Sequence, residues 1–458
     1  MKSIGIIGGG ISGLSAAYYL TRLAPSVSVH LFEKHGPGGW IQTMNKDGFT
    51  FETGPRSIRL NLRSREVMEI ASQVGCLDKI VFSSKRVADS QIYADGELFR
   101  LLPEGQFRML KGILTVPIYR KLFLLNFCLP KPRAQPVEDE SIPEFMSKYL
   151  RFWSEEDKKW FIETFLDAFQ QGIYLGDINK LSARSCLPFS HMFMKKYYPS
   201  KYHPYKDIMK NPDVIRTYKK GISMKSNAFN FQGGLSTLIN ALLENLRTYP
   251  NFTYHETGVT SVKEHNSRGV ISTSKENFEV DQVISTLPSN IFSGLLEGYE
   301  NISELCNKVT HKSIFTLNVG FKENHRLDGL GYLVPNKENS KLAGVLFDST
   351  QFTNLKPCVS VMGKVSSKET THELTKELMQ DFRKQTQCDT QIATILGTYW
   401  ENALPQYNVG HYKIVEQVEQ ESPNWLKVSG QSLYPSGIPN CVLTSKNLVN
   451  SLVHKPIA

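Results

Sequence analysis

The sequence lacks the patterns that mark a disulfide scaffold, a zinc site or a membrane-spanning helix. Its seven cysteines include no C-x-x-C pair, which is typical of a protein in a reducing compartment without structural zinc. No apolar run reaches the roughly 18 residues that a spanning helix needs. Because the first residues already have the pattern of a strand, we expect neither a signal peptide nor a removable transit peptide. Internal repeats and low-complexity segments are also missing.

Length and charge narrow the function classes further. The chain has 458 residues, enough for two or three domains, and a net charge of +9. Such a charge suits nucleic acid, an anionic membrane or an acidic small molecule. The basic residues are dispersed and no nucleic-acid-binding motif is present, so we expect no nucleic-acid partner. An anionic membrane surface and an acidic substrate both stay open.

The most informative pattern lies at the N-terminus. An apolar run, Ile4–Ile7, leads directly into the glycine-rich segment Gly8–Gly13 and then into a helix-like stretch, Leu14–Leu20. A second apolar run, Val27–Phe32, ends at the acid Glu33. A strand, a glycine turn, a helix, a strand and an acid at this spacing predict a dinucleotide-binding βαβ unit.

Each glycine of this unit has its own predicted role. Gly8 makes the tight turn, Gly10 lets the backbone approach a pyrophosphate, and Gly13 lets the helix pack closely on the sheet. The pyrophosphate would lie at the positive end of the helix, and Glu33 would accept a hydrogen bond from a ribose hydroxyl. A βαβ unit without a ligand is the alternative, and it leaves Glu33 unexplained. The predicted contacts here are Gly8, Gly9, Gly10, Ile11, Ser12, Gly13 and Glu33.

Composition divides the rest of the chain into zones. The zone from 107 to 218 is mostly helical in pattern, and its segment 107–129 mixes apolar residues with a few basic ones. This segment suits either an interfacial membrane segment or a buried helix pair. Trp153, Trp160, Tyr197 and Tyr198 would correspondingly be interface anchors or core. Strand-like runs such as Ile314–Phe321 and Val359–Gly363, with a helix at Thr371–Gln385, predict a mixed sheet within 300–395.

Motifs beyond Glu33 indicate which dinucleotide is bound. The pair Gly38–Gly39 follows the ribose acid closely and resembles the extended motif of the FAD-dependent amine oxidase superfamily. Taken alone, this pair would be an ordinary surface turn. Next to the first motif, it favours FAD over NAD.

Further motifs narrow the resemblance to the protoporphyrinogen oxidase family. Ala403–His411 resembles its A-[IL]-P-Q-Y-x-x-G-H signature, and Phe51–Arg59 resembles its F-E-x-G-P-R-x-[IL]-R element. Gly172–Ser185 and Gly329–Pro335 resemble two more of its motifs, in the same order along the chain. The resemblance implies FAD-dependent oxidation of protoporphyrinogen IX to protoporphyrin IX in three two-electron steps, with oxygen as acceptor and hydrogen peroxide as product. In eukaryotes the family acts in haem biosynthesis on the inner mitochondrial membrane or in plastids.

The resemblance also implies an α/β fold class: a Rossmann-like FAD-binding domain, a mixed-sheet substrate domain and a mostly helical membrane-binding domain. It favours the membrane alternative for the segment 107–129, while a dimer contact by this segment stays open. We therefore expect a peripheral protein of the mitochondrial inner membrane. The predicted domains are 1–94, 219–295 and 396–458 for FAD binding, 95–218 for the helical membrane domain, and 296–395 for substrate binding.

Carried over by position, the resemblance implies further site residues. Val259 would meet the adenine side through its backbone, and the chain at Ser436–Ile438 would close over the isoalloxazine. Because tautomerisation of the substrate can move protons between steps, no catalytic acid or base is predicted, and His411 is expected to be structural. The added flavin contacts are Gly39, Trp40, Gly54, Pro55, Arg56, Ser57, Val259, Ser436, Gly437 and Ile438, and the tetrapyrrole contacts are Leu330, Gly331, Leu333 and Met362.

Two positions depart from the family pattern. Ser90 stands where family members often carry an arginine that pairs with a substrate propionate, and Lys85 or Arg86 could substitute for it. Asn440 replaces an acid near the C-terminus. Two alternatives therefore stay open. One is a flavin amine or polyamine oxidase, with Tyr434 as half of an aromatic cage and a lysine-held water. The other is a membrane-bound flavoprotein that binds a tetrapyrrole without turnover.

Overall fold

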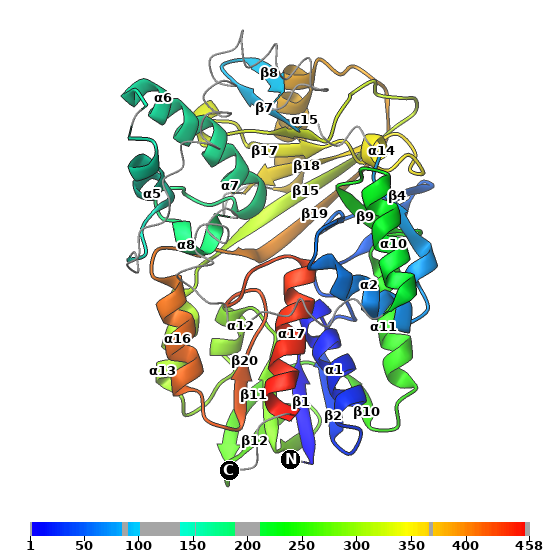
Figure 1. The fold of residues 1–458 in the computed structure, drawn as a ribbon, viewed down its shortest axis with the longest axis vertical. Coiled ribbons are helices and arrows are strands. Elements are labelled where there is room, and N and C mark those ends of the chain that lie inside the picture. The colour runs from blue at the N-terminus through cyan, green and yellow to red at the C-terminus, as the bar shows by residue number, and fades with distance from the viewer. Residues whose placement is uncertain are drawn as a thin grey trace.

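The computed structural model describes residues 2–84, 90–100, 138–151, 153–187, 211–365 and 370–453. The predicted segment 107–129, Tyr197, Tyr198, Lys85 and Arg86 lie outside these residues. The described chain forms two main sheets. A parallel sheet with its helices lies in the lower half of Figure 1, and a larger sheet with its own helices lies above it.

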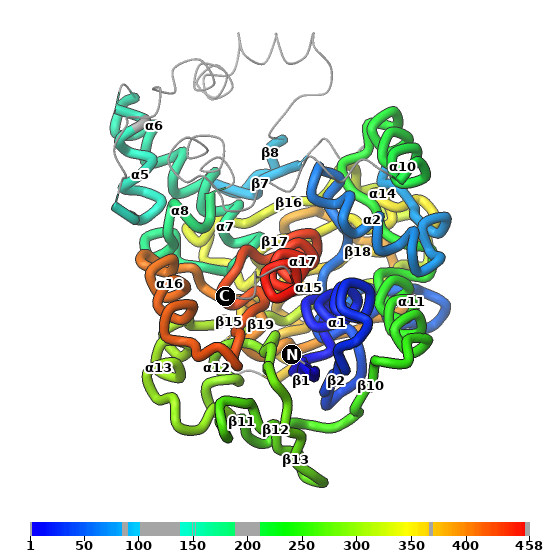
Figure 2. The backbone as a smooth tube through the Cα atoms, turned by 60° about the horizontal axis from the view of Figure 1, so that its bottom comes forward, coloured from blue at the N-terminus to red at the C-terminus, as the bar shows by residue number. Residues whose placement is uncertain are grey.

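The lower sheet is parallel and has the strand order β10-β2-β1-β14-β20. Ile4 and Ile6 of β1 are fully buried, as a continuous apolar run in a parallel sheet requires. One face carries α1, α11 and α17, which come forward together in Figure 2. The other face packs on a small antiparallel sheet, β11-β12-β13. The bounds are β1 Ser3–Ile7, α1 Ile11–Leu23, β2 Ser28–Glu33, α11 Ser236–Arg247, β10 Phe252–Glu256, β11 Val259–His265, β12 Arg268–Thr273, β13 Asn277–Val280, β14 Gln282–Ser285, β20 Leu426–Val428 and α17 Ile438–Val453.

This sheet joins three parts of the chain that lie far apart in sequence. Its strands come from residues 3–33, 252–285 and 426–428. The three parts fall within the three predicted FAD-binding segments, although the limits of those segments stay predictions. Ser445 of α17 donates a hydrogen bond to the Ser12 carbonyl of α1 over 2.8 Å, so the last helix is fastened directly to the glycine-turn helix.

The upper sheet has seven strands in the order β19-β15-β18-β17-β16-β7-β8. Its core includes Phe315, Leu317 and Val361, and the covering helix α15 contributes Leu378. The capping box at Thr370 and Glu373 fixes the start of α15. The bounds are β7 Ser90–Ala94, β8 Glu97–Arg100, β15 His311–Phe321, β16 Gly331–Leu333, η4 Asn336–Glu338, β17 Leu342–Leu346, α14 Asp348–Gln351, β18 Cys358–Lys364, α15 Thr371–Thr386 and β19 Ile392–Pro405.

Two parts of this sheet cross the predicted domain limits. The hairpin β7-β8 pairs with β16, although its residues fall in the predicted nucleotide and helical segments. Strand β19 runs to Pro405 and pairs with β15 along most of its length, past the predicted limit at 395. Both differences arise because strand pairing depends on long-range contacts, which a local apolar pattern does not report.

A helical unit flanks the upper sheet. The helices α6, η3 and α7 follow one another without a break, and α7 packs against β16 and β17 of the larger sheet (Figure 1). Trp153 and Trp160 are half-buried and pack on the core of this unit. Among the described residues, no helix has both the length and the apolar character to cross a bilayer. The bounds are α5 Ile142–Tyr149, α6 Glu155–Trp160, η3 Phe161–Leu166 (a π-helical turn), α7 Asp167–Tyr174, α8 Ala183–Cys186 and α10 Pro212–Ser223.

The remaining elements are short strands and helices outside the two main sheets. The helices α13 and α16 pack together beside the lower sheet (Figure 1). The bounds are β3 Thr43–Lys46, β4 Phe49–Glu52, β5 Ile58–Arg59, α2 Ser64–Gln73, η1 Leu77–Lys79, β6 Ile80–Phe82, β9 Ala228–Phe231, α12 Ser289–Ser293, α13 Glu300–Lys308 and α16 His411–Glu421.

Candidate active site

The glycine turn between β1 and α1 has the geometry of an anion cradle. Gly10 caps α1 and offers no side-chain cap hydrogen bond to the N–H groups of the first turn. A Cβ on Gly10 would find no atom within 4 Å, so space lies directly in front of these groups. A Cβ on Gly13 would lie 1.9 Å from the Gly8 carbonyl oxygen, because the helix packs on the turn there. Open space before uncapped N–H groups fits a pyrophosphate.

Glu33 is held beside this cradle. Its Oε2 accepts a hydrogen bond from the Gly9 N–H at 2.6 Å, and its Oε1 accepts one from the His35 N–H at 2.8 Å. Strand β10 runs alongside, with Glu256 opposite Glu33, and the next turn brings Gly258 against the Lys34 side chain. The predicted adenine-side contact, Val259, begins β11 immediately after this turn.

The second glycine pair lies against the first. The Gly38 N–H donates to the Gly9 carbonyl at 2.8 Å, and a Cβ on Gly39 would lie 3.4 Å from the Gly10 Cα. Gly54 packs still more closely on Trp40, the residue after Gly39, since a Cβ on Gly54 would lie 1.9 Å from the Trp40 carbonyl oxygen. The predicted cofactor contacts from both segments are therefore brought together into one continuous wall.

A cavity of about 360 Å³ follows this wall toward the upper sheet. Among the described residues that line it, Arg56 is the one with an ionisable side chain. The other lining side chains are mainly apolar, with two glutamines among them. Its lining is Trp40, Gly54, Pro55, Arg56, Ser57, Gln171, Gly172, Ile173, Leu175, Ile314, Thr316, Leu346, Met362, Trp400, Ala403, Leu404 and Gln431.

Arg56 separates this cavity from a smaller one. The second cavity, of about 100 Å³, is also lined by Arg56, together with Glu52, Asn318 and Asp348. The buried Arg56 donates from Nη1 to the Glu52 carbonyl and, over 2.7 Å, to the Asn318 Oδ1, while its Nη2 has no partner among the described residues. Ser360 bonds both the Asn318 Oδ1 and the Asp348 carboxylate. Burial lowers the pKa of Arg56 and raises the pKa of Asp348, and each charge opposes the shift of the other.

The predicted tetrapyrrole contacts lie on or beside the cavity wall. Met362 lines the cavity, and Leu333 lies next to it, since a Cβ on Gly172 would lie 2.5 Å from the Leu333 Cδ2. Gly331 has φ +134° and pairs with the lining residue Leu346. Leu330 is half-buried one residue before β16, and its carbonyl accepts the Phe347 N–H. Leu330, Gly331 and Leu333 are therefore neighbours of the lining rather than part of it.

The predicted C-terminal closure lies at the start of α17. Ser436 and Gly437 precede the helix, which begins at Ile438. Asn440, which stands where the family carries an acid, bonds the Ser436 carbonyl through Nδ2 at 2.6 Å and accepts from Arg63 through Oδ1 at 2.8 Å. An amide can make both of these bonds at once, whereas a carboxylate has no donor. Asn440 therefore fixes this turn in a way that an aspartate could not.

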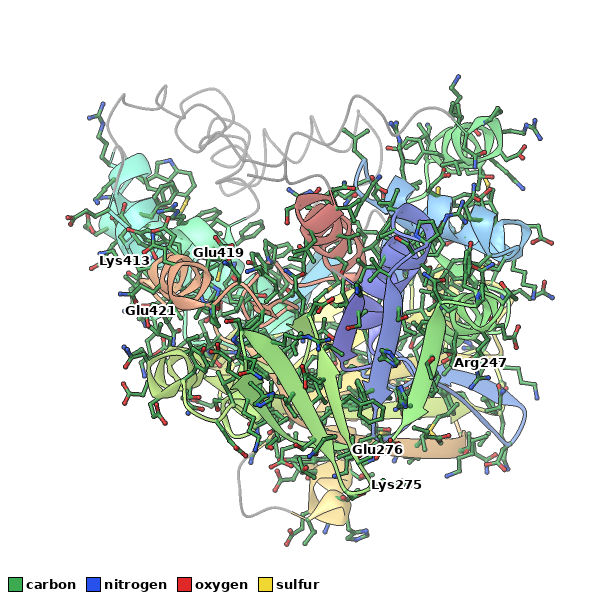
Figure 3. All side chains as sticks on the ribbon, turned by 90° about the horizontal axis from the view of Figure 1, so that it is seen from below. Arg247, Lys275, Glu276, Lys413, Glu419 and Glu421 are labelled. Atoms are coloured by element: carbon green, nitrogen blue, oxygen red, sulfur yellow. The ribbon has the colours of Figure 1, made fainter. Side chains whose placement is uncertain are left out.

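Two residues considered from the sequence have structural positions. His411 is buried in the first turn of α16 and bonds the Leu433 carbonyl at 3.0 Å through Nε2, with its ring 4.6 Å from that of Tyr407. Tyr434 donates to the Glu419 Oε1 at 2.6 Å, and Glu419 belongs to α16, as Figure 3 shows. Neither His411 nor Tyr434 is among the lining residues of the cavity.

The sequence analysis missed several lining residues. Gln171 and Leu175 come from α7 and the turn after it, Thr316 comes from β15, and Trp400 comes from β19. The Gly172–Ser185 motif contains Leu175 but gave no reason to select it, or its neighbour Gln171, as a lining residue. Trp400 is adjacent to the C-terminal signature, and its Nε1 donates to the Thr53 carbonyl at 2.6 Å.

Comparison with known proteins identifies the family. The model of the flavin-containing amine oxidoreductases matches residues 11–449. The chain belongs to this family. It is 26% identical to a protoporphyrinogen oxidase of Dictyostelium discoideum over 99% of both chains. It is also 26% identical to a coproporphyrinogen III oxidase of Staphylococcus aureus over 97% of both chains. A solved structure from Exiguobacterium sp. 255-15 is 20% identical and superposes with a TM-score of 0.77, covering 99% of this chain and 98% of that one.

Family membership confirms the α/β fold class and the cofactor. The protein is an FAD-dependent oxidoreductase, and FAD supplies the two-electron chemistry when it is bound. The open cradle before α1 and the wall from Gly38 to Ser57 fit that cofactor. The protein's own residues would hold the dinucleotide with backbone groups and present an apolar cavity beside it.

Proposed function

We propose that this chain oxidises protoporphyrinogen IX to protoporphyrin IX. The overall reaction removes six electrons and six protons in three two-electron steps. Three molecules of oxygen accept them and become three molecules of hydrogen peroxide. The sequence motifs and the relatives named protoporphyrinogen oxidase and coproporphyrinogen III oxidase support this substrate class.

The observation that carries the proposal is the chemistry of the cavity wall. Its one ionisable lining side chain among the described residues is an arginine, which does not lose its proton in proteins and cannot act as a base. A porphyrinogen suits such a wall, because its tautomers can relocate protons between steps without a protein acid or base. Two broad apolar faces of a macrocycle also match the apolar lining.

The residues have distinct proposed roles. Met362 and Leu346 would pack on the macrocycle and exclude water from its reacting carbon. Gln171 and Gln431 would orient polar edges of the substrate. Each lines the cavity. Orientation of this kind is the main contribution that a flavoprotein makes to a hydride transfer.

A polyamine oxidase is the second candidate that the family allows. Trp40 and Trp400 both line the cavity and could flank an amine. No lysine lines the cavity among the described residues, so the expected lysine-held water has no residue to hold it there. Lys312 donates to the carbonyl of the lining residue Leu175, and Lys364 pairs with the lining residue Ile314. Their positive charges would repel a cationic amine. These observations favour the porphyrinogen.

We also propose that the protein acts at the surface of the mitochondrial inner membrane. The net charge of +9 and the mixed apolar and basic composition of 107–129 support attraction to anionic lipid. Co-sedimentation with vesicles that contain or lack anionic lipid tests this part. Binding that is equal for both vesicle types, or absent from both, would contradict it.

Turnover is tested with detergent-purified, flavin-loaded protein. Protoporphyrinogen IX, coproporphyrinogen III and putrescine are each supplied in air, and porphyrin fluorescence and peroxide are followed. We expect fluorescence to rise faster than autoxidation, with about three peroxide molecules per porphyrin. The flavin-free protein is the matched control. A folded, flavin-loaded protein that oxidises neither porphyrinogen would refute the proposal and leave a flavoprotein that binds without turnover, whereas oxidation of putrescine alone would make it an amine oxidase.

A further inference from the structure

Two lysines border the cavity at one end of the larger sheet. Lys312 of β15 lies opposite Leu404 of β19, and Lys364 of β18 lies opposite Ile314 of β15. Residues that are directly opposite in an antiparallel pair project from the same face of the sheet. Leu404 and Ile314 both line the cavity. Both lysines therefore stand on the cavity face, just beyond its apolar lining.

Each ammonium group donates one hydrogen bond to the described part of the protein and has capacity for more. Lys312 Nζ donates to the carbonyl of the lining residue Leu175 over 2.6 Å, and Lys364 Nζ donates to the Asn336 Oδ1 over 2.9 Å. An ammonium has three donors. Within the described parts of the chain, no carboxylate forms an ion pair with either lysine.

A hydrogen-bonded chain fixes the head of Lys364. The Asn336 N–H and Nδ2 donate to the two Asp167 carboxylate oxygens over 2.6 and 3.2 Å. Gln171, which lines the cavity, also donates to the Asp167 Oδ1, at 3.3 Å. Asp167 is only 3% exposed. Asp167 therefore holds Asn336 and Gln171 by hydrogen bonds. Asn336 in turn positions the Lys364 ammonium group, which forms no ion pair with Asp167.

The charges around the two lysines leave a net excess of one positive charge. The charges that interact with Lys312 are those of Asp177, Lys180 and Asp167, and the charges that interact with Lys364 are those of Asp167 and Lys312. The Lys180 Nζ lies 3.9 Å from the Asp177 Oδ2. Burial lowers the pKa of both Lys312 and Lys364, because partial loss of water disfavours the charged form. A carboxylate arriving here would restore the lost stabilisation with charge-assisted hydrogen bonds.

This end of the cavity is distinct from the position of Ser90. Ser90 pairs with Gly331, Gly331 with Leu346, and Leu346 with Ser360 of β18. Lys364 lies four residues further along the same strand, which is about 13 Å at 3.3 Å per residue. Ser90 is not among the lining residues of the cavity, and it lies three strands across the sheet from Lys364 as well as this distance along it.

We propose that Lys312 and Lys364 form a carboxylate-binding site that receives the propionate groups of the substrate. The inference rests on the proposed function, and it adds an orientation: the carboxylate edge of the macrocycle faces the lysines, and an uncharged edge faces Ser90. The apolar lining of the cavity contacts the macrocycle itself.

The test compares the free acid with its ester. Protoporphyrinogen IX and its dimethyl ester are supplied to the wild type, to the double variant Lys312→Met/Lys364→Met, and to Lys312→Arg/Lys364→Arg. Lys322→Met, an exposed lysine just beyond the far end of β15, is the matched control. Binding of the product, protoporphyrin IX, and of its dimethyl ester is measured in parallel by fluorescence, with flavin content as the check on folding.

We expect the methionine double variant to raise the KM for the free acid about tenfold with little change in kcat, as loss of charged hydrogen bonds at a half-exposed site implies. The KM of the methionine double variant for the ester should be unchanged. The Lys322→Met control should keep the wild-type affinity for both the acid and the ester, and the arginine variant should retain most of the acid binding. Equal effects on acid and ester, or none on the acid, would overturn the inference. If the wild type oxidises neither porphyrinogen, the proposed function fails. The binding of protoporphyrin IX and its dimethyl ester then still tests whether the two lysines bind carboxylates.

Discussion

Replacing two glycines of the N-terminal turn separates cofactor binding from folding. Gly10 has φ −70°, and a Cβ there would find open space, so the folded chain can accept an alanine without strain. The alanine reduces the entropy of the unfolded chain, which stabilises by about 0.4–1 kcal/mol, and weakens the helix cap by a similar amount. We therefore expect Gly10→Ala to leave the stability of the flavin-free protein nearly unchanged.

Gly13→Ala, by contrast, should lower the stability of the flavin-free protein. Its Cβ would lie 1.9 Å from the Gly8 carbonyl oxygen and 3.0 Å from the Thr286 Oγ1. The backbone must shift by about 1 Å to relieve the first contact, and overpacking of this kind costs about 1–3 kcal/mol. Better helix propensity returns up to about 1 kcal/mol. Because the clash is between two backbone segments, we expect a net loss near 2 kcal/mol in the free energy of unfolding.

The assay measures denaturant unfolding without flavin and FAD affinity by calorimetry. In Gly10→Ala the new methyl group occupies the space before the helix N-terminus, so FAD affinity should fall at least tenfold, about 1.4 kcal/mol. The stabilisation that FAD gives the wild type, about 2.7 kcal/mol at one hundred times Kd, should fall to about 1.4 kcal/mol or less at the same FAD concentration. Wild-type FAD affinity in Gly10→Ala would refute the placement of the pyrophosphate. Wild-type stability in Gly13→Ala would refute the packing argument.

Three further changes test other parts of the site. Glu33→Gln should lower FAD affinity about tenfold, since a charged acceptor is lost, and isothermal titration checks this; an unchanged affinity would exclude Glu33 from the ribose. Burial lowers the pKa of His311 to about 4, so its contribution to stability is present above pH 6.5 and is lost as the pH falls toward 4. The stability difference between the wild type and His311→Gln should shift by about 3 kcal/mol against the wild type over that range in urea titrations, and a constant difference would contradict the assignment. Ser90→Arg should lower the KM for the tetracarboxylate coproporphyrinogen III more than for protoporphyrinogen IX, because it adds a cation at the uncharged end; an equal effect on both would mean that Ser90 does not face that edge.

The βαβ unit that carries the candidate nucleotide site could be predicted closely because its determinants are local. The turn, the helix and the acid at Glu33 occur within one βαβ unit, and each glycine reports a requirement of its own backbone. The substrate cavity could be predicted only in part. Met362 followed from the resemblance, but Thr316 and Gln171 reach the cavity through the register of β15 and the path of α7. Those depend on contacts between distant segments, which no apolar period encodes.

The positions of the protein cations that bind the substrate carboxylates also depend on contacts between distant segments. A cofactor held mainly by backbone groups constrains the chain at glycines, so the motifs near Gly10 and Gly39 keep the family pattern even when side chains elsewhere differ. A carboxylate, by contrast, can be met by any cation that the sheet brings to the rim of the cavity. Ser90 lies on β7, away from the strand ends that carry Lys312 and Lys364. The absence of an arginine at residue 90 is therefore compatible with an active porphyrinogen oxidase, provided that the macrocycle binds with its propionates toward the lysines.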